Sequence, residues 1–196
     1  MINNDLEGLL AYLCGPIDHA DDDGVGWRRT LTEELSNRYA MKTLDPTNKP
    51  FKGVHGSAFE EIGNEKQNAL DMRSSGDYES LAEKMRMIVR IDLRMVDLSD
   101  LLIAYIPKGI RVCGSIHEIV TACESKKPTL IVFEGGREEA SNWYWGMLPT
   151  TPHTDNRSGW IFDSWDALFE YLDEINEGKN PEPKLSRWVI LDGDAR

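Results

Sequence analysis

Short apolar runs recur along the first two thirds of this chain, separated by longer stretches in which apolar and charged residues mix. Three runs carry no charged side chain, and they span residues 9–14 (LLAYLC), 101–106 (LLIAYI) and 129–133 (TLIVF). Unbroken apolar runs of this length are typical of strands that are buried on both faces of a sheet. Residues 41–44 form a shorter candidate strand, and residues 188–191 (WVIL) form a fifth.

Between these runs, apolar side chains recur every three or four residues, which is the spacing of one helix face. The pattern occupies residues 27–39, 81–98, 115–125 and 164–175. Ser164 is the expected N-terminal cap of the last helix, with Asp166 in its first turn. Residues 47–80 hold Gly, Asn, Ser and charged side chains with weak periodicity. We expect a long loop there, with room for one helical turn.

The alternation of strand and helix patterns predicts a mostly parallel, five-stranded sheet with helices on both faces. A length of 196 residues suits a single domain. We expect its core at about residues 9–133 and a C-terminal extension at residues 134–196. In such sheets, ligands bind at the carboxyl ends of the strands. The loops after Cys14, Leu44 and Ile106 are therefore expected to surround a binding site.

The chain is strongly acidic, with a formal net charge of −12 and a sequence pI near 4.8. Nucleic acids and anionic membranes are bound through basic surfaces, so neither is an expected partner. A small substrate that is neutral or weakly charged fits this composition better.

The cysteines and the N-terminus indicate a cytoplasmic protein. Cys14, Cys113 and Cys123 are odd in number and share no metal-ligand spacing. This usage suits a reducing compartment, and no metal site is predicted. The first ten residues, MINNDLEGLL, lack the basic start and long apolar run of a signal peptide. No stretch approaches the ~18 apolar residues that span a bilayer.

Glu118 is the first candidate for chemistry. Gly114 and Ser115 start a predicted helix directly beyond a strand, which puts Glu118 in the first helical turn. Backbone N–H groups and the helix dipole there favour an ionised carboxylate. An exposed carboxylate of low pKa suits attack on the anomeric carbon of a sugar. The alternative is a capping box, in which Ser115 caps the helix and Glu118 turns back to the backbone.

Asp92 and Tyr12 are the other two candidates. Asp92 shares the apolar face of the helix at residues 81–98, where a carboxylate is costly unless it is paired or faces a pocket. In a pocket it would hold a raised pKa and donate a proton to a leaving base. The alternative is an ion pair with an arginine of the same helix. Tyr12, near the end of the first strand, either orients Glu118 through its hydroxyl or belongs only to the core.

Several short motifs follow one another in order along residues 9–147. They are YLCGPI, a helix with Trp27-Arg28, LDPTN after the second strand, Asp92 eight residues before Asp100, LLIAYIP, CGSIHEIVTA and WYWGM. In this order and spacing they resemble the nucleoside 2-deoxyribosyltransferases and their relatives, the deoxynucleoside 5′-monophosphate N-hydrolases.

The resemblance implies a flavodoxin-like, Rossmann-like fold and a homo-oligomer whose active sites are shared between subunits. It implies that Glu118 is the nucleophile, that Asp92 contacts and protonates the base, and that Tyr12 orients the nucleophile. It implies no metal or organic cofactor. The positions that we expect to contact the substrate are Gly15, Pro16, Asp45, Asn48, Gly114 and Ser115.

The sequence departs from the family pattern at Val112, six residues before Glu118. The transferases place an aspartate near the sugar at this position, and the hydrolases place a serine for phosphate. The loop after the first strand carries Asp18 and three more aspartates at residues 21–23, where a phosphate would sit. Like charges repel by about 1 kcal/mol even in water. We expect a neutral nucleoside to be preferred over its 5′-monophosphate, unless these aspartates point to solvent.

Histidines and tryptophans are weaker candidates. His117 points to a different helix face from its glutamate neighbour, which favours a surface or interface position, and His55 lies in the long loop. Trp143, Trp145 and Trp160 are expected to pack in the protein or at a subunit contact rather than to stack on a base.

The sequence thus predicts transfer of 2-deoxyribose between nucleobases, through cleavage of the N-glycosidic bond and a covalent ester on Glu118. The first alternative is a hydrolase that passes the sugar to water and acts on nucleosides or deoxynucleoside 5′-monophosphates. The second is a non-catalytic nucleotide-binding module on the same fold, since a fold does not determine a function.

Overall fold

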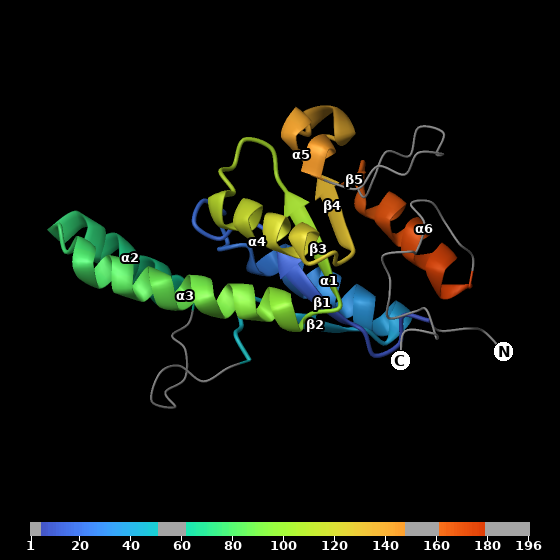
Figure 1. Cartoon of the computed structure of the whole chain (residues 1–196), viewed down its shortest axis with the longest axis horizontal. Coiled ribbons are helices and arrows are strands. Elements are labelled where there is room, and N and C mark those ends of the chain that lie inside the picture. Colours follow the sequence, from blue (N-terminus) through green and yellow to red (C-terminus); the bar gives the residue numbers. More distant parts are fainter. Residues whose placement is uncertain (1–4, 51–61, 148–160, 179–196) are drawn as a thin grey trace.

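The computed structural model describes residues 5–50, 62–147 and 161–178, which form an α/β sandwich around an all-parallel, five-stranded sheet (Figure 1). The strands are β1 (Leu10–Cys14), β2 (Lys42–Leu44), β3 (Leu101–Ile106), β4 (Thr129–Phe133) and β5 (Ile161–Phe162). Their order in the sheet is β2-β1-β3-β4-β5, which is the flavodoxin-like order. The predicted fold class is confirmed.

The helices cover both faces of the sheet. They are α1 (Val25–Tyr39), α2 (Ile62–Ser75), α3 (Tyr78–Leu98), α4 (Cys113–Glu124), α5 (Asn142–Met147) and α6 (Trp165–Asn176). Successive residues of a strand point to opposite faces. Ala11 and Leu13 of β1 therefore pack with α1 and α6, whereas Tyr12 and Cys14 pack on the face covered by α3 and α4. The polar groups of β1 thus face α4, which carries Glu118.

Two predicted helices have clear local causes. The α3 helix has a strong apolar stripe, and the Asp77 side chain caps it by accepting a hydrogen bond from the backbone N–H of Ser80. The Ser164 hydroxyl accepts from the backbone N–H of Ala167 at the start of α6. The predicted cap of α6 is thereby confirmed.

The prediction of a long loop at residues 47–80 was wrong, because α2 occupies residues 62–75 of this segment. Apolar residues do not gather on one face of α2, so it has no helical periodicity to detect. It forms a helix by packing against α3. Together the two helices extend as an arm beyond the edge of the sheet (Figure 1).

The fifth strand of the described sheet is β5, not the WVIL segment at residues 188–191, which lies outside the described residues. With only two residues, β5 is too short to give an apolar run. Helices α1 and α4 each begin two residues earlier than predicted, at Val25 and Cys113. Across the described part of the chain, no helix combines the length and apolar character needed to cross a membrane.

Candidate functional site

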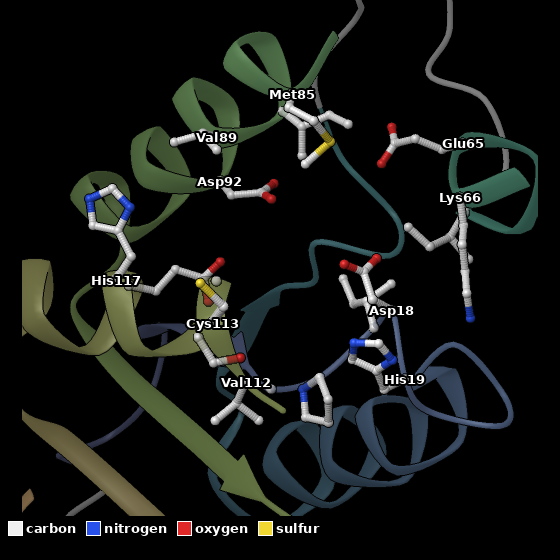
Figure 2. Close-up of a pocket in the computed structure, with 18 of the residues that line it drawn as sticks. Asp18, His19, Glu65, Lys66, Met85, Val89, Asp92, Val112, Cys113 and His117 are labelled. Atoms are coloured by element: carbon white, nitrogen blue, oxygen red, sulfur yellow. The ribbon is translucent and has the colours of Figure 1, made fainter. Parts of the chain in front are cut away.

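A pocket of about 390 Å³ opens where the loops that follow β1, β2 and β3 meet helices α2, α3 and α4 (Figure 2). This volume lies within the range of small-molecule sites, about 300–1,000 Å³. Glu118 and Asp92 both line the pocket. Met85 and Val89 of α3 contribute to an apolar wall, and Asp18 and His19 lie across from them (Figure 2). The loops predicted to surround a site therefore do meet at one pocket.

Glu118 lies in the second turn of α4, not the first. The N-cap of α4 is Val112, so Ser115 sits inside the first turn and is not the cap. The capping-box alternative is therefore wrong. The expectation of a low pKa is also wrong, because burial raises the pKa of the Glu118 carboxyl. The nearby Cys14 and Tyr12 side chains partly oppose that rise.

Tyr12 and Cys14 lie beneath Glu118 on the same face of β1. Both side chains are fully buried, and the Cys14 thiol donates to the carbonyl of Ser115 at 3.5 Å. The Tyr12 hydroxyl has no hydrogen-bond partner of ordinary geometry among the described residues. Burial, followed by the charge of Glu118, raises the pKa of Tyr12 well above its usual value. Tyr12 is therefore a neutral hydroxyl held beside the carboxylate that it was predicted to orient.

Asp92 is a mostly buried carboxyl with a pKa of about 7. Burial raises this pKa, Lys49 lowers it, and Glu118 and Glu65 raise it further. The Asp92 Oδ1 atom lies 3.9 Å from the Lys49 Nζ atom, and it has no hydrogen-bond partner among the described residues. The cation beside Asp92 is thus Lys49 rather than an arginine of its own helix. Asp92 does face a pocket with a raised pKa, as the sequence predicted.

Arg28 fixes the shape of the loop that follows β1. Its side chain is fully buried, and its guanidinium donates to the backbone carbonyls of Leu13, Gly15, Pro16 and Gly24 over 2.8–3.3 Å. Its Nε atom also lies 3.6 Å from the Asp45 carboxylate. A rigid guanidinium with several donors can hold several carbonyls at once. In the sequence, Arg28 stands out only as part of a motif, and no local pattern predicts that it binds the carbonyls of the loop after β1.

The expected substrate contacts divide into two groups. Gly15, Pro16, Gly114 and Ser115 line the pocket. Asp45 and Asn48 are not among its lining residues. The Asp45 carboxylate instead accepts hydrogen bonds from the backbone N–H and hydroxyl of Thr47, at 2.8 and 2.7 Å, and so closes the turn after β2.

Gly15 has a geometric reason to be glycine. A Cβ atom at this position would lie 2.6 Å from the Trp27 side chain and 3.1 Å from the Tyr105 carbonyl oxygen. The backbone of the loop therefore approaches its neighbours too closely for any side chain.

Two of the aspartates in the acidic loop after β1 have contacts within the protein. The Asp22 carboxylate accepts from the backbone N–H groups of Gly24 and Gly26, and Asp23 pairs with Lys66 at 2.6 Å. Of the four aspartates, only Asp18 lines the pocket. Asp18 is therefore the aspartate of this loop that could contact a bound phosphate directly, whereas the charges of Asp21 and Asp22 would act from outside the lining of the pocket.

The pocket also contains residues that the sequence assigned elsewhere or missed. The exposed His117 lines the pocket. Four further charged residues line it, namely Lys49, Glu65, Lys66 and Arg111. Val112 lines it too, at the position where relatives of the resembled family carry a polar group. Glu65 and Lys66 belong to α2, so the failure to predict that helix concealed them.

Other candidate aromatic residues lie away from the pocket or outside the described chain. Trp143 is exposed and Trp145 packs against the core cluster on the α3 and α4 side. His55 and Trp160 lie outside the described residues. No group of three or more His, Cys, Asp or Glu side chains within residues 5–50, 62–147 and 161–178 is arranged to hold a metal ion.

No protein-family model matches this chain, and no curated protein matches its sequence.

Proposed function

We propose that this protein cleaves the N-glycosidic bond of a 2′-deoxynucleoside and transfers the 2-deoxyribosyl group to another nucleobase. In this proposal, Glu118 is the nucleophile and Asp92 is the acid that protonates the leaving base. The supporting observation is that these two carboxyl groups, from α4 and α3, line one pocket at the carboxyl end of the sheet. Glycosidic bonds are commonly cleaved by a pair of carboxyl groups in this division of roles.

The surroundings of the two groups support this assignment. The Cys14 thiol, the Tyr12 hydroxyl and the Arg28 cation each lower the pKa of Glu118 against the effect of burial. Such neighbours favour the ionised form that a nucleophile needs. Asp92 has a buried oxygen without a donor and a pKa of about 7, so a large fraction of it holds a proton near neutral pH. Burial raises the pKa of both carboxyl groups, so the division of roles rests on the polar neighbours of Glu118 and on the Asp92 oxygen without a donor.

In the first step, a Glu118 carboxylate oxygen attacks C1′ of the sugar while the bond from C1′ to the base nitrogen breaks. The electron pair of that bond stays on the base, and the base takes the proton of Asp92. The products are a free base and a 2-deoxyribosyl ester of Glu118. In the second step, a nitrogen of the acceptor base loses its proton to the Asp92 carboxylate and attacks C1′, while the bond from C1′ to the Glu118 oxygen breaks and its electron pair returns to the Glu118 carboxylate. This step releases the new nucleoside and restores both carboxyl groups.

The remaining pocket residues have supporting roles. In this proposal, Tyr12 orients Glu118. Arg28 holds the loop with Gly15 and Pro16 at the edge of the pocket. The apolar wall with Met85 and Val89 suits the face of a nucleobase, which is planar and weakly polar.

The proposal is tested by mixing a 2′-deoxynucleoside with a different free base and separating the products by chromatography. We expect the exchanged deoxynucleoside to form with the wild type and not with Glu118→Gln. Free 2-deoxyribose without the exchanged product would instead identify a hydrolase. If the wild type binds the nucleoside but releases no base, the chain is a binding module and the proposal fails.

A further inference from the structure

Lys49 is a buried cation between two carboxylates in the wall of the pocket. Its Nζ atom lies 3.2 Å from Oε1 of Glu65 and 3.9 Å from Oδ1 of Asp92, and it donates to the carbonyl of Pro46 at 2.9 Å. Only 4% of the Lys49 side chain and 9% of the Glu65 side chain are exposed. Solvent and salt therefore screen these interactions much less than they screen surface pairs.

The three groups come from three separate parts of the chain. Lys49 follows β2, Glu65 lies in the first turn of α2, and Asp92 lies in α3. Glu65 and Asp92 extend from their two helices towards the same space (Figure 2). The charge on Lys49 is thus shared between a carboxylate with no place in the proposed reaction and the proposed acid.

We propose that Lys49 is a positioning residue that sets the pH range over which Asp92 keeps its proton, and that Glu65 tunes this effect by competing for the same cation. The role in catalysis rests on the proposed function, which makes Asp92 the acid. The electrostatic coupling itself can be measured without any reaction.

The charges that face Asp92 define the expected signs. Lys49 and, more weakly, Arg28 favour the ionised form of Asp92, whereas Glu118 and Glu65 favour the protonated form, in addition to burial. Removing the charge of Lys49 must therefore raise the pKa of Asp92. Removing the charge of Glu65 must lower it, because a repulsive charge is lost and Lys49 is no longer shared. Because the effect of Lys49 on Asp92 is larger than that of Glu65, removing both charges should leave the pKa of Asp92 above its wild-type value but below that of Lys49→Met.

The coupling is tested by titrating the Asp92 carboxyl carbon with ¹³C NMR in the wild type, Lys49→Met, Glu65→Gln and the double variant. An opposite charge within about 4–6 Å lowers a carboxyl pKa by about 1–3 units. We therefore expect the pKa of Asp92 to rise by at least about one unit in Lys49→Met, to fall in Glu65→Gln, and to lie between the wild-type and Lys49→Met values in the double variant.

Lys66→Met is the matched control, because Lys66 lines the same pocket but pairs with Asp23 at 2.6 Å. Lys66→Met should leave the pKa of Asp92 unchanged. Lys49→Met leaves Glu65 buried without this partner and is the variant at risk of misfolding. Glu65→Gln and the double variant differ only at Lys49, so that comparison carries the test on its own. Equal shifts in Lys49→Met and Lys66→Met, or shifts of the same sign in Lys49→Met and Glu65→Gln, would overturn the inference.

The same variants distinguish this inference from the proposed function. If Asp92 is the acid, the alkaline limb of the pH–rate profile should move in the same direction as the NMR titration in each variant. If Lys49→Met turns over substrate with the alkaline limb of its pH–rate profile and the NMR pKa of Asp92 both unchanged, the role of Lys49 alone is overturned. If the pKa of Asp92 changes between the variants as expected but the protein cleaves no deoxynucleoside, the proposed function alone is overturned.

Discussion

Asp92 and Tyr12 each hold a buried polar atom without a hydrogen-bond partner among the described residues. An unpaired buried polar atom costs about 1–3 kcal/mol, so fold stability alone does not explain either residue. Both side chains interact with Glu118 through their charge or polarity. Groups of this kind that persist beside a pocket are expected where chemistry uses them.

Asp92→Asn should separate acid catalysis from binding. The amide keeps the size of the side chain but does not donate a proton to the leaving base. We expect cleavage of 2′-deoxyguanosine to fall by about 10²–10⁴-fold, which is the usual contribution of an acid. The N7-methylated nucleoside, whose base leaves without protonation, should be cleaved at nearly the wild-type rate. Equal losses for both substrates would contradict the assignment of Asp92 as the acid.

Tyr12→Phe should change the pH dependence without a loss of stability. The variant removes a hydroxyl that lowers the pKa of Glu118, so the limb of the pH–rate profile set by ionisation of Glu118 should move to higher pH. Because this hydroxyl makes no hydrogen bond of ordinary geometry among the described residues, its removal should leave the free energy of unfolding nearly unchanged. Urea denaturation beside the rate profile checks both parts. A marked loss of stability with an unmoved profile would make Tyr12 a core residue only.

At the scale of elements, the Arg28 side chain of α1 holds the loop that connects β1 to α1 in place. Arg28→Lys keeps the charge, but one ammonium group cannot reach the carbonyls of Gly15, Pro16 and Gly24 together. We expect the free energy of unfolding to fall by at least about 2 kcal/mol, because each buried carbonyl left unpaired costs roughly 1–3 kcal/mol.

The matched control for this change is Arg29→Lys, because Arg29 is the exposed neighbour of Arg28 on the same helix. It should alter the free energy of unfolding by less than about 0.5 kcal/mol, as surface substitutions usually do. Similar losses in the two variants, measured by urea denaturation, would show that the carbonyl contacts of Arg28 do not hold the loop.

The elements that sequence patterns predicted well are those whose own residues specify them. The central strands β1, β3 and β4 are unbroken apolar runs, and α3 and α6 carry clear apolar stripes with side-chain caps. The α2 helix has neither signal and depends on its contact with α3. Because α2 supplies Glu65 and Lys66, the missed helix also concealed one wall of the pocket.

At the scale of the whole molecule, the pKa of Asp92 links fold stability to pH. The folded-state pKa of about 7 lies above the ordinary value of 3.8, so the folded protein binds this proton more tightly than the unfolded chain does. The stability supplied by the proton is present below about pH 4 and is lost as pH rises towards about 7, by up to about 1.4 kcal/mol per pH unit. Asp92→Asn lacks this loss.

The comparison that checks this link is urea denaturation of the wild type and Asp92→Asn at about pH 5 and about pH 7. The free energy of unfolding should fall more between these values in the wild type than in the variant. The difference isolates Asp92 from the other acidic groups of a chain with a formal net charge of −12. An equal fall in both proteins would show that the pKa of Asp92 is not raised by folding.

Sequence reasoning reached further for the fold than for the site. Candidate residues Glu118, Asp92, Gly15 and Ser115 do meet in one pocket, because parallel strands bring their following loops to a common edge. The state of Glu118 was predicted wrongly, because a two-residue error in the start of α4 changes its helical turn and burial overrides any dipole effect. The contacts of Lys49 join three elements, and no local pattern records them.

Intact-protein mass spectrometry after a short, acid-quenched incubation with 2′-deoxynucleosides tests the central claim most directly. We predict that the wild type gains one 2-deoxyribosyl mass, that the mass maps to the tryptic peptide of residues 112–126, and that Glu118→Gln gains none. An adduct that persists in Glu118→Gln would contradict the assignment of the nucleophile. The absence of both an adduct and free base across deoxynucleosides and their 5′-monophosphates would contradict glycosyl transfer by this pocket.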